Sequence, residues 1–244
     1  MNKQDIILTH QKHIFPSVFH YFKEPMVVTR AKDQYVWDAD ENQYLDFFGG
    51  IVTVSVGHSN ETVNKKVTDQ MAKLQHVSTV YINEPQALLA KKIAEVSPGG
   101  KLTKTFFTNS GSEANETAYL TARLYTGSHE IVALRHGYHG RSSATMASSG
   151  VSTWKLGGQS LPGFVHAVNG YCYRCPFGLK YPSCNIQCAR DMEETIRTAT
   201  SGKVAALIAE PIQGVGGLIT PPKEYFEIVA LAGAVPTRTG RFES

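Results

Sequence analysis

Short apolar runs recur along the chain after residue 100. They cover Lys104–Thr108, Glu130–Arg135 and Val204–Ala209, and a polar cluster follows each run. Apolar runs of this length indicate strands that are covered on both faces, as in parallel sheets. Because helical segments separate the runs, the pattern predicts an α/β fold with a mostly parallel sheet and flanking helices.

The first half of the chain carries helical periodicity instead. Apolar residues recur near the helical period within Glu61–Gln75, which predicts one helix, and a second is expected over Glu84–Val96. The sequence Pro-Gly-Gly at residues 98–100 stops the second helix. Residues 1–50 are expected to contain a solvated first helix and short strands, whereas residues 150–190 are rich in loops and proline.

The polar cluster after the first run is suited to holding a phosphate. Ser110, Gly111 and Ser112 precede a helix that opens with Glu113. Backbone N–H groups at a helix start lack intrahelical partners and lie at the positive end of the helix dipole, which favours an anion. Gly111 allows close approach, and the two serine hydroxyls can donate. The alternative is an ordinary N-cap without a ligand, with Ser112 as the capping residue and Glu113 in the first turn.

Two more polar clusters follow the other strands. His136-Gly-Tyr-His-Gly140 comes after the second run, and Glu210-Pro-Ile-Gln-Gly214 comes after the third. Ligands of open parallel sheets collect beyond the carboxyl ends of the strands. The three clusters are therefore expected to converge on one crevice.

These motifs, in this order, resemble the class III aminotransferases, which are pyridoxal-phosphate enzymes of fold type I. The resemblance runs from about His13 to about Val229 and, in its details, is strongest to the alanine–glyoxylate aminotransferase 2 and 4-aminobutyrate aminotransferase side of the class. It implies an incomplete fold type I large domain over residues 51–230. Residues 1–50 would form the amino-terminal arm and part of the small domain, and residues 231–244 match nothing in the family.

The resemblance also implies roles for single residues. Gly111 and Ser112, with Ser110 beside them, match the cradle of the pyridoxal 5'-phosphate phosphate group. Tyr138 matches the aromatic that stacks on the pyridine ring, His139 its neighbour at the cofactor edge, and Glu210 an acidic residue near the ring. From the residues alone, a packing aromatic, a hydrogen-bonded turn histidine and a strand-end carboxylate remain open.

The chain is much shorter than the family it resembles, so truncation after about residue 230 is expected. The Schiff-base lysine and the aspartate that pairs with the pyridine nitrogen are not found, and no catalytic residue is assigned. The lysines present are expected to be solvated surface charges. Core strands would then lack neighbours, which predicts bare apolar faces and marginal stability or association.

The implied full-length reaction moves an amino group from an amino acid or amine, such as alanine or 4-aminobutyrate, to a 2-oxo acid. Family members form homodimers. One alternative is a catalytically incomplete fragment without turnover. A second is a phospho-lyase, since phospho-lyases of the same class share these motifs.

Composition limits the classes of partner that the chain is expected to bind. The net charge is +3 and charged residues make up 18% of the chain, which gives no basis for nucleic-acid binding. No apolar run reaches the length of a membrane span. The amino terminus resembles neither a secretory signal nor a mitochondrial presequence, so a cytoplasmic location is expected.

All four cysteines lie in the loop-rich segment, with the spacing C-x2-C-x8-C-x3-C from Cys172 to Cys188. Four thiols in hairpin-like loops suit a structural, non-catalytic zinc site. The eight-residue central spacing is shorter than in common zinc modules and favours free thiols instead. No metal ligand is assigned.

Overall fold

The computed structural model describes residues 1–18, 20–158 and 161–234, and it divides into two compact units. Unit 1 comprises residues 1–101 and unit 2 residues 102–244. The predicted boundary between residues 50 and 51 follows the family's domain limits and stays a prediction. Most of the expected non-matching tail, residues 235–244, lies outside the described residues.

Unit 1 combines helices with a small antiparallel sheet of strand order β1-β2-β3. Its elements are α1 (Lys3–His13), β1 (Val28–Lys32), β2 (Tyr35–Asp38), β3 (Gln43–Leu45), α2 (Gly49–Val52), α3 (Glu61–Lys73) and α4 (Glu84–Val96), followed by a 3₁₀ turn at Pro98–Gly100. The structure confirms the first helix, the short strands and both periodic helices. The helix predicted to reach Gln75 ends two residues earlier, where Leu74 is extended.

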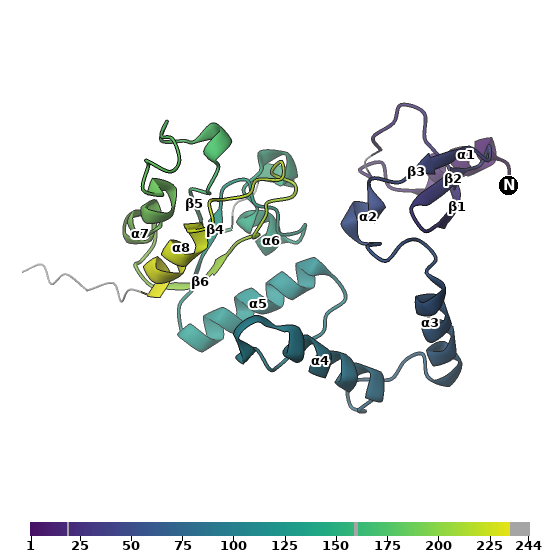
Figure 1. Ribbon diagram of the computed structural model, residues 1–244, viewed down its shortest axis with the longest axis horizontal. Helices are drawn as coiled ribbons and strands as arrows, with labels where there is room; N and C mark the ends of the chain where they lie inside the picture. The colour runs from purple at the N-terminus through teal and green to yellow at the C-terminus, as the bar shows by residue number, and fades with distance from the viewer. Residues whose placement is uncertain (19, 159–160, 235–244) are drawn as a thin grey trace, which may run out of the picture. The chain divides into compact units, whose positions relative to one another are not determined.

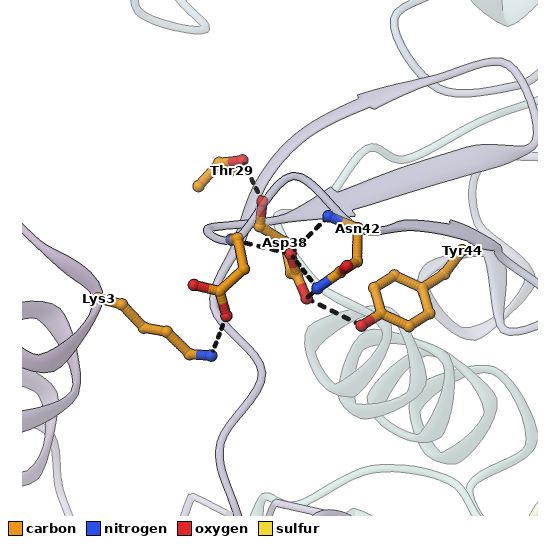
Figure 2. Close-up of polar contacts among 6 residues, drawn as sticks. Lys3, Thr29, Asp38, Asn42 and Tyr44 are labelled. Atoms are coloured by element: carbon orange, nitrogen blue, oxygen red, sulfur yellow. Dashed lines mark hydrogen bonds and ion pairs between the residues drawn. The ribbon is translucent and has the colours of Figure 1, made fainter.

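Asp38 organises the turn between β2 and β3 (Figure 2). Its carboxylate accepts hydrogen bonds from the backbone N–H groups of Asp40 and Asn42, from the Asn42 amide and from the Tyr44 hydroxyl, at 2.8 to 3.3 Å. These donors, Asn42 first, lower the pKa of Asp38 to about 2. Asp38 is 5% exposed and is the one buried residue among those described in unit 1.

Unit 2 contains a three-stranded parallel sheet of order β5-β4-β6 with helices on both faces (Figure 1). Its elements are α5 (Gly111–Thr126), β4 (Glu130–Leu134), α6 (Ser143–Ser148), β5 (Phe164–Ala167), α7 (Gln187–Ala199), β6 (Val204–Ile208) and α8 (Tyr225–Ala234), with 3₁₀ turns at Ser152–Trp154, Leu156–Gly158 and Cys172–Arg174. The strands predicted from the second and third apolar runs are confirmed. They pair directly, with Val132 opposite Leu207.

The central strand β4 supplies side chains to two hydrophobic clusters. Val132 and Leu134 pack with residues of α7 and α8, whereas Ile131 packs with Tyr119 of α5 and Ala144 of α6. Successive side chains of a strand point to opposite faces. Both faces of β4 are therefore covered, which explains why its sequence is apolar without alternation.

One prediction about unit 2 needs correction. Lys104–Thr108 is not a strand, because none of the described strands lies beside it and a strand requires a hydrogen-bonded neighbour. Residues 150–190 are rich in loops and turns, as expected, and they also contain the short strand β5, which pairs in parallel with β4.

Unit 2 also has a bare apolar groove beside α5. Its volume is about 470 Å³, and its lining includes Phe106, Ala118, Ala122 and Tyr125. Phe106 is 78% exposed and Tyr125 is 91% exposed. Apolar side chains of α5 and of the first apolar run are therefore exposed along this groove.

Candidate functional site

The amino terminus of α5 presents free backbone donors. Ser110 is the N-cap, and its hydroxyl accepts from the N–H of Glu113 at 3.2 Å. Within the part of the chain that the structure describes, the N–H groups of Gly111 and Ser112 have no hydrogen-bond acceptor. A Cβ added at Gly111 would meet no heavy atom within 4 Å. The helix is therefore capped by Ser110 and not by Ser112. The two N–H groups that follow the cap remain without an acceptor among the described residues.

The turn after β4 packs directly on this helix start. The Ser112 hydroxyl accepts from the N–H of Arg141 at 3.2 Å, and the Asn115 amide donates to the His139 carbonyl at 2.7 Å. Gly140 has φ +130°, and a Cβ there would overlap Ser112 Oγ and lie 2.8 Å from Thr145 Oγ1. Only glycine fits this junction.

Glu210 ties the third cluster to the second. Its Oε1 accepts from the N–H of Tyr138 at 2.8 Å, and its Oε2 accepts from the N–H of Gly214 at 3.1 Å. The three polar clusters therefore lie next to one another, as expected, although the first of them does not follow a strand. Both carboxylate oxygens contact backbone donors, so the geometry shows Glu210 as an organiser of two turns.

His139 is buried, with 6% exposure, and its backbone N–H donates to Ser149 Oγ at 3.0 Å. Burial, with a smaller effect from nearby His166, lowers the pKa of His139 to about 4. Its ring atom Nε2 is buried without a hydrogen-bond partner in the described part of the chain. His139 is therefore a neutral imidazole with one free polar atom.

Tyr138 is half-buried, and its ring lies 5.1 Å from that of Trp154 at an interplanar angle of 60°. The two rings thus contact each other at the edge of the turn, a geometry that is common for aromatic pairs. The cofactor roles of Ser110, Gly111, Ser112, Tyr138, His139 and Glu210 stay predictions.

Sequence reasoning missed the buried amides that support the site. Gln213 donates from Nε2 to the Arg135 carbonyl at 2.8 Å and accepts from the Asn169 amide at 2.5 Å. Asn169 and Gln213 are 3% and 2% exposed. Gln213 lies within the motif that starts at Glu210, and its polar side chain beside a buried strand was the available signal.

The four cysteines are unpaired thiols. In the described ranges, no group of three or more His, Cys, Asp or Glu side chains is arranged to hold a metal ion. The zinc interpretation therefore receives no support from the geometry. None of the helices that the structure describes is long and apolar enough to cross a membrane.

Fold and site together define a parallel α/β protein in which the start of α5, with two backbone N–H groups that have no acceptor among the described residues, packs on the turn after β4. The model of the class III aminotransferase family matches residues 20–232. The chain therefore belongs to the class III aminotransferases, as its motifs indicated.

Individual relatives agree with this assignment. The mitochondrial alanine–glyoxylate aminotransferase 2 homolog 2 of Arabidopsis thaliana is 40% identical over 237 residues, covering 95% of this chain and 48% of the relative. A solved (S)-enantioselective omega-transaminase from Thermomicrobium roseum has a TM-score of 0.86 at 31% identity, over 95% of this chain and 54% of that one. The omega transaminase of Pseudomonas jessenii, solved in complex with PMP, has a TM-score of 0.81 at 28% identity, over 91% and 52%.

The chain spans about half the length of the relatives it matches. Fold type I, incomplete relative to these neighbours, is therefore the fold of the described residues. A cytoplasmic location stays a prediction.

Proposed function

We propose that this chain provides the phosphate-binding side of a pyridoxal 5'-phosphate site in an aminotransferase. The single observation that carries the proposal is the pair of free N–H groups at Gly111 and Ser112, at the start of a 16-residue helix. A phosphate dianion there would receive two hydrogen bonds and the favourable field of the helix dipole.

The surrounding residues fit the group. The space beside Gly111 is open, so a bulky anion can approach the backbone. Tyr138 is linked through its backbone to Glu210, and the Tyr138 ring lies on the same turn that packs against Ser112. This arrangement supports a flat ring next to the phosphate, with Tyr138 as its stacking partner.

Bound pyridoxal phosphate supplies an electron sink for amino-group transfer. In that reaction the residues of this chain would bind and orient the cofactor. The α5 start holds the phosphate, the buried amides hold the turn, and His139 stays neutral near the site. The proposed whole-protein activity is amino transfer from an amino acid, such as alanine, to a 2-oxo acid.

Binding of the phosphate can be tested by equilibrium dialysis with pyridoxal phosphate and with pyridoxal, which lacks the phosphate. We expect Gly111→Asp to weaken binding of the phosphate form at least tenfold relative to Gly111→Asn, because like charges a few ångströms apart cost on the order of 1–4 kcal/mol. The two variants differ in charge and hardly in size. Equal affinities of both variants for pyridoxal phosphate would refute the phosphate assignment.

The catalytic lysine is a separate question. We propose that none of the described lysines has this role, because the three converging clusters, residues 109–112, 136–140 and 210–214, contain no lysine. After incubation with pyridoxal phosphate and borohydride reduction, peptide mapping should find no lysine labelled stoichiometrically. A single labelled lysine, together with amino transfer between alanine and glyoxylate, would overturn this part.

A further inference from the structure

Trp154 lies beside the candidate site but belongs to none of the three polar clusters. Its ring centroid is 5.1 Å from that of Tyr138, and the two ring planes meet at 60°. Among the rings that the structure describes, Trp154 is the one that contacts the ring of Tyr138. Tyr138 donates a hydrogen bond through its backbone N–H, whereas its hydroxyl has no partner within the described ranges. Trp154 is therefore the aromatic neighbour that fixes the orientation of the Tyr138 ring.

The backbone places Trp154 there through Gly150. The N–H of Gly150 donates to the Gly137 carbonyl at 2.7 Å, and the Gly150 carbonyl accepts from the N–H of His136 at 3.3 Å. A Cβ at Gly150 would lie 2.6 Å from the backbone N of His136, so this close approach requires glycine. Shortly after Gly150, the 3₁₀ turn Ser152–Trp154 brings the indole ring into place. The segment that carries the indole is thus tied directly to the turn after β4.

The angle between the two rings leaves Tyr138 able to stack on a third ring. A parallel arrangement would cover one face of the tyrosine, whereas the observed tilt of 60° is that of an edge contact. A half-buried side chain without such a neighbour samples several rotamers, and ordering it on binding costs affinity. The contact with Trp154 restricts these rotamers before any ligand arrives.

We propose that Trp154 is a positioning residue that holds the Tyr138 ring in the orientation needed to stack on a bound pyridine ring. This inference rests on the proposed stacking role of Tyr138. Trp154 acts through Tyr138 and does not itself contact the ligand. Its removal therefore weakens binding of pyridoxal phosphate only when Tyr138 is present.

A double-variant cycle tests this dependence. Affinity for pyridoxal phosphate is measured by equilibrium dialysis for the unsubstituted chain, Trp154→Ala, Tyr138→Ala and the variant with both changes. We expect Trp154→Ala to weaken binding about threefold to tenfold, because one aromatic pair is lost, and to have no further effect in the Tyr138→Ala background. Trp154→Phe keeps a ring and should bind within about twofold of the unsubstituted chain. Phe177→Ala is the matched control, because Phe177 has the same exposure of 37% as Trp154, and it should leave the affinity unchanged.

Circular dichroism of the bound pyridoxal phosphate gives a readout that a merely structural role would not change. The compound is achiral, so its absorption band shows circular dichroism only when the protein holds the ring in one orientation. At equal saturation we expect this band to be weaker in Trp154→Ala and to recover in Trp154→Phe. Far-ultraviolet circular dichroism checks the folding of each variant. If Trp154→Ala does not fold, Trp154→Leu, which keeps an apolar side chain without an aromatic ring, replaces it.

The possible failures can be told apart. Unchanged affinity and an unchanged band in folded Trp154→Ala would overturn this inference and leave the proposed function in place. An equal loss of affinity with and without Tyr138 would also overturn it, because Trp154 would then act independently of Tyr138. Absence of binding by the unsubstituted chain would overturn the proposed function together with this inference.

Discussion

The junction between the α5 start and the turn after β4 gives the sharpest test of the site geometry. Gly140 has φ +130°, and a Cβ there would overlap Ser112 Oγ and come within 3.0 Å of Thr145 Cβ. We therefore expect Gly140→Ala to destabilise unit 2. Gly111 is the matched control, because its φ is not positive and a Cβ there meets nothing within 4 Å.

The magnitude follows from two contributions. A non-glycine residue at a strained φ costs about 1–3 kcal/mol. The overlap with Ser112 and Thr145 adds about 1–3 kcal/mol, as for other insertions into packed sites. The expected loss of about 2–6 kcal/mol is a large part of the roughly 5–15 kcal/mol that stabilise a typical domain. Gly111→Ala should change stability by no more than about 1 kcal/mol, and in the stabilising direction.

Urea unfolding measures both variants. Trp154 fluorescence reports on unit 2, because the Trp154 ring contacts the ring of Tyr138 in the turn after β4. A Trp37→Phe background removes the other tryptophan. Adding Ser112→Ala to Gly140→Ala removes the nearest clashing atom and should recover about 1 kcal/mol or more of coupling. Equal midpoints for Gly140→Ala and Gly111→Ala would refute the packing of the turn on the helix start.

Three further predictions use the core and the titrating groups. Ile131→Ala removes a fully buried side chain of β4 and should lower the free energy of unfolding by about 2–5 kcal/mol in the same assay. His139 stays neutral in the folded chain down to about pH 4, whereas in the unfolded chain it binds a proton near pH 6.5. The free energy of unfolding should therefore fall as the pH drops from 6.5 to 4. His139→Gln should reduce this dependence of stability on pH. The pKa of Asp38 is about 2 in the folded chain and about 3.8 in the unfolded chain. The ionised carboxylate therefore stabilises unit 1 above pH 3.8, and this stabilisation is lost as the pH falls toward 2. Acid titration followed by circular dichroism should show that Asp38→Asn lacks this pH dependence.

The elements that could be predicted from the sequence are those whose signal is local. Continuous apolar residues in Glu130–Leu134 and Val204–Ile208 indicated strands covered on both faces, and the structure pairs them. The helix Glu84–Val96 was predicted with its observed bounds, and a Pro-Gly-Gly stop follows it. The structure adds Asn83 as its N-cap. Helix caps and helix-terminating residues depend on positions that are adjacent in sequence, so they can be recognised without knowledge of the fold.

The elements that could not be predicted depend on distant partners. Lys104–Thr108 has the apolar pattern of a strand, yet no described strand pairs with it. Conversely, Phe164–Ala167 is only four residues long and lies among glycines and prolines, but it becomes a strand because β4 offers a free edge. A segment forms a strand only when a second segment pairs with it, whereas a sequence pattern describes one segment by itself.

In the candidate site, too, local features could be predicted from the sequence and contacts between distant residues could not. Tyr138 and Glu210 follow two paired parallel strands, so their closeness could be predicted from the sequence. Ser112 lies beside them although the run before it, Lys104–Thr108, is not a strand. The contacts that hold them, such as Asn169 to Gln213, join residues 44 positions apart and carry no local signal. Such buried amide pairs follow from the need to satisfy every polar group left inside the fold.

Glu210 illustrates how geometry refines a role implied by resemblance. A free carboxylate beside a phosphate dianion would oppose its binding. In the structure both Glu210 oxygens accept hydrogen bonds from backbone N–H groups, of Tyr138 and of Gly214, which spread its charge over two turns. The same residue therefore fixes the backbone of the proposed stacking tyrosine, while the donors of Gly111 and Ser112 stay free. An acidic residue and an anion site can coexist here because their backbone donors are different.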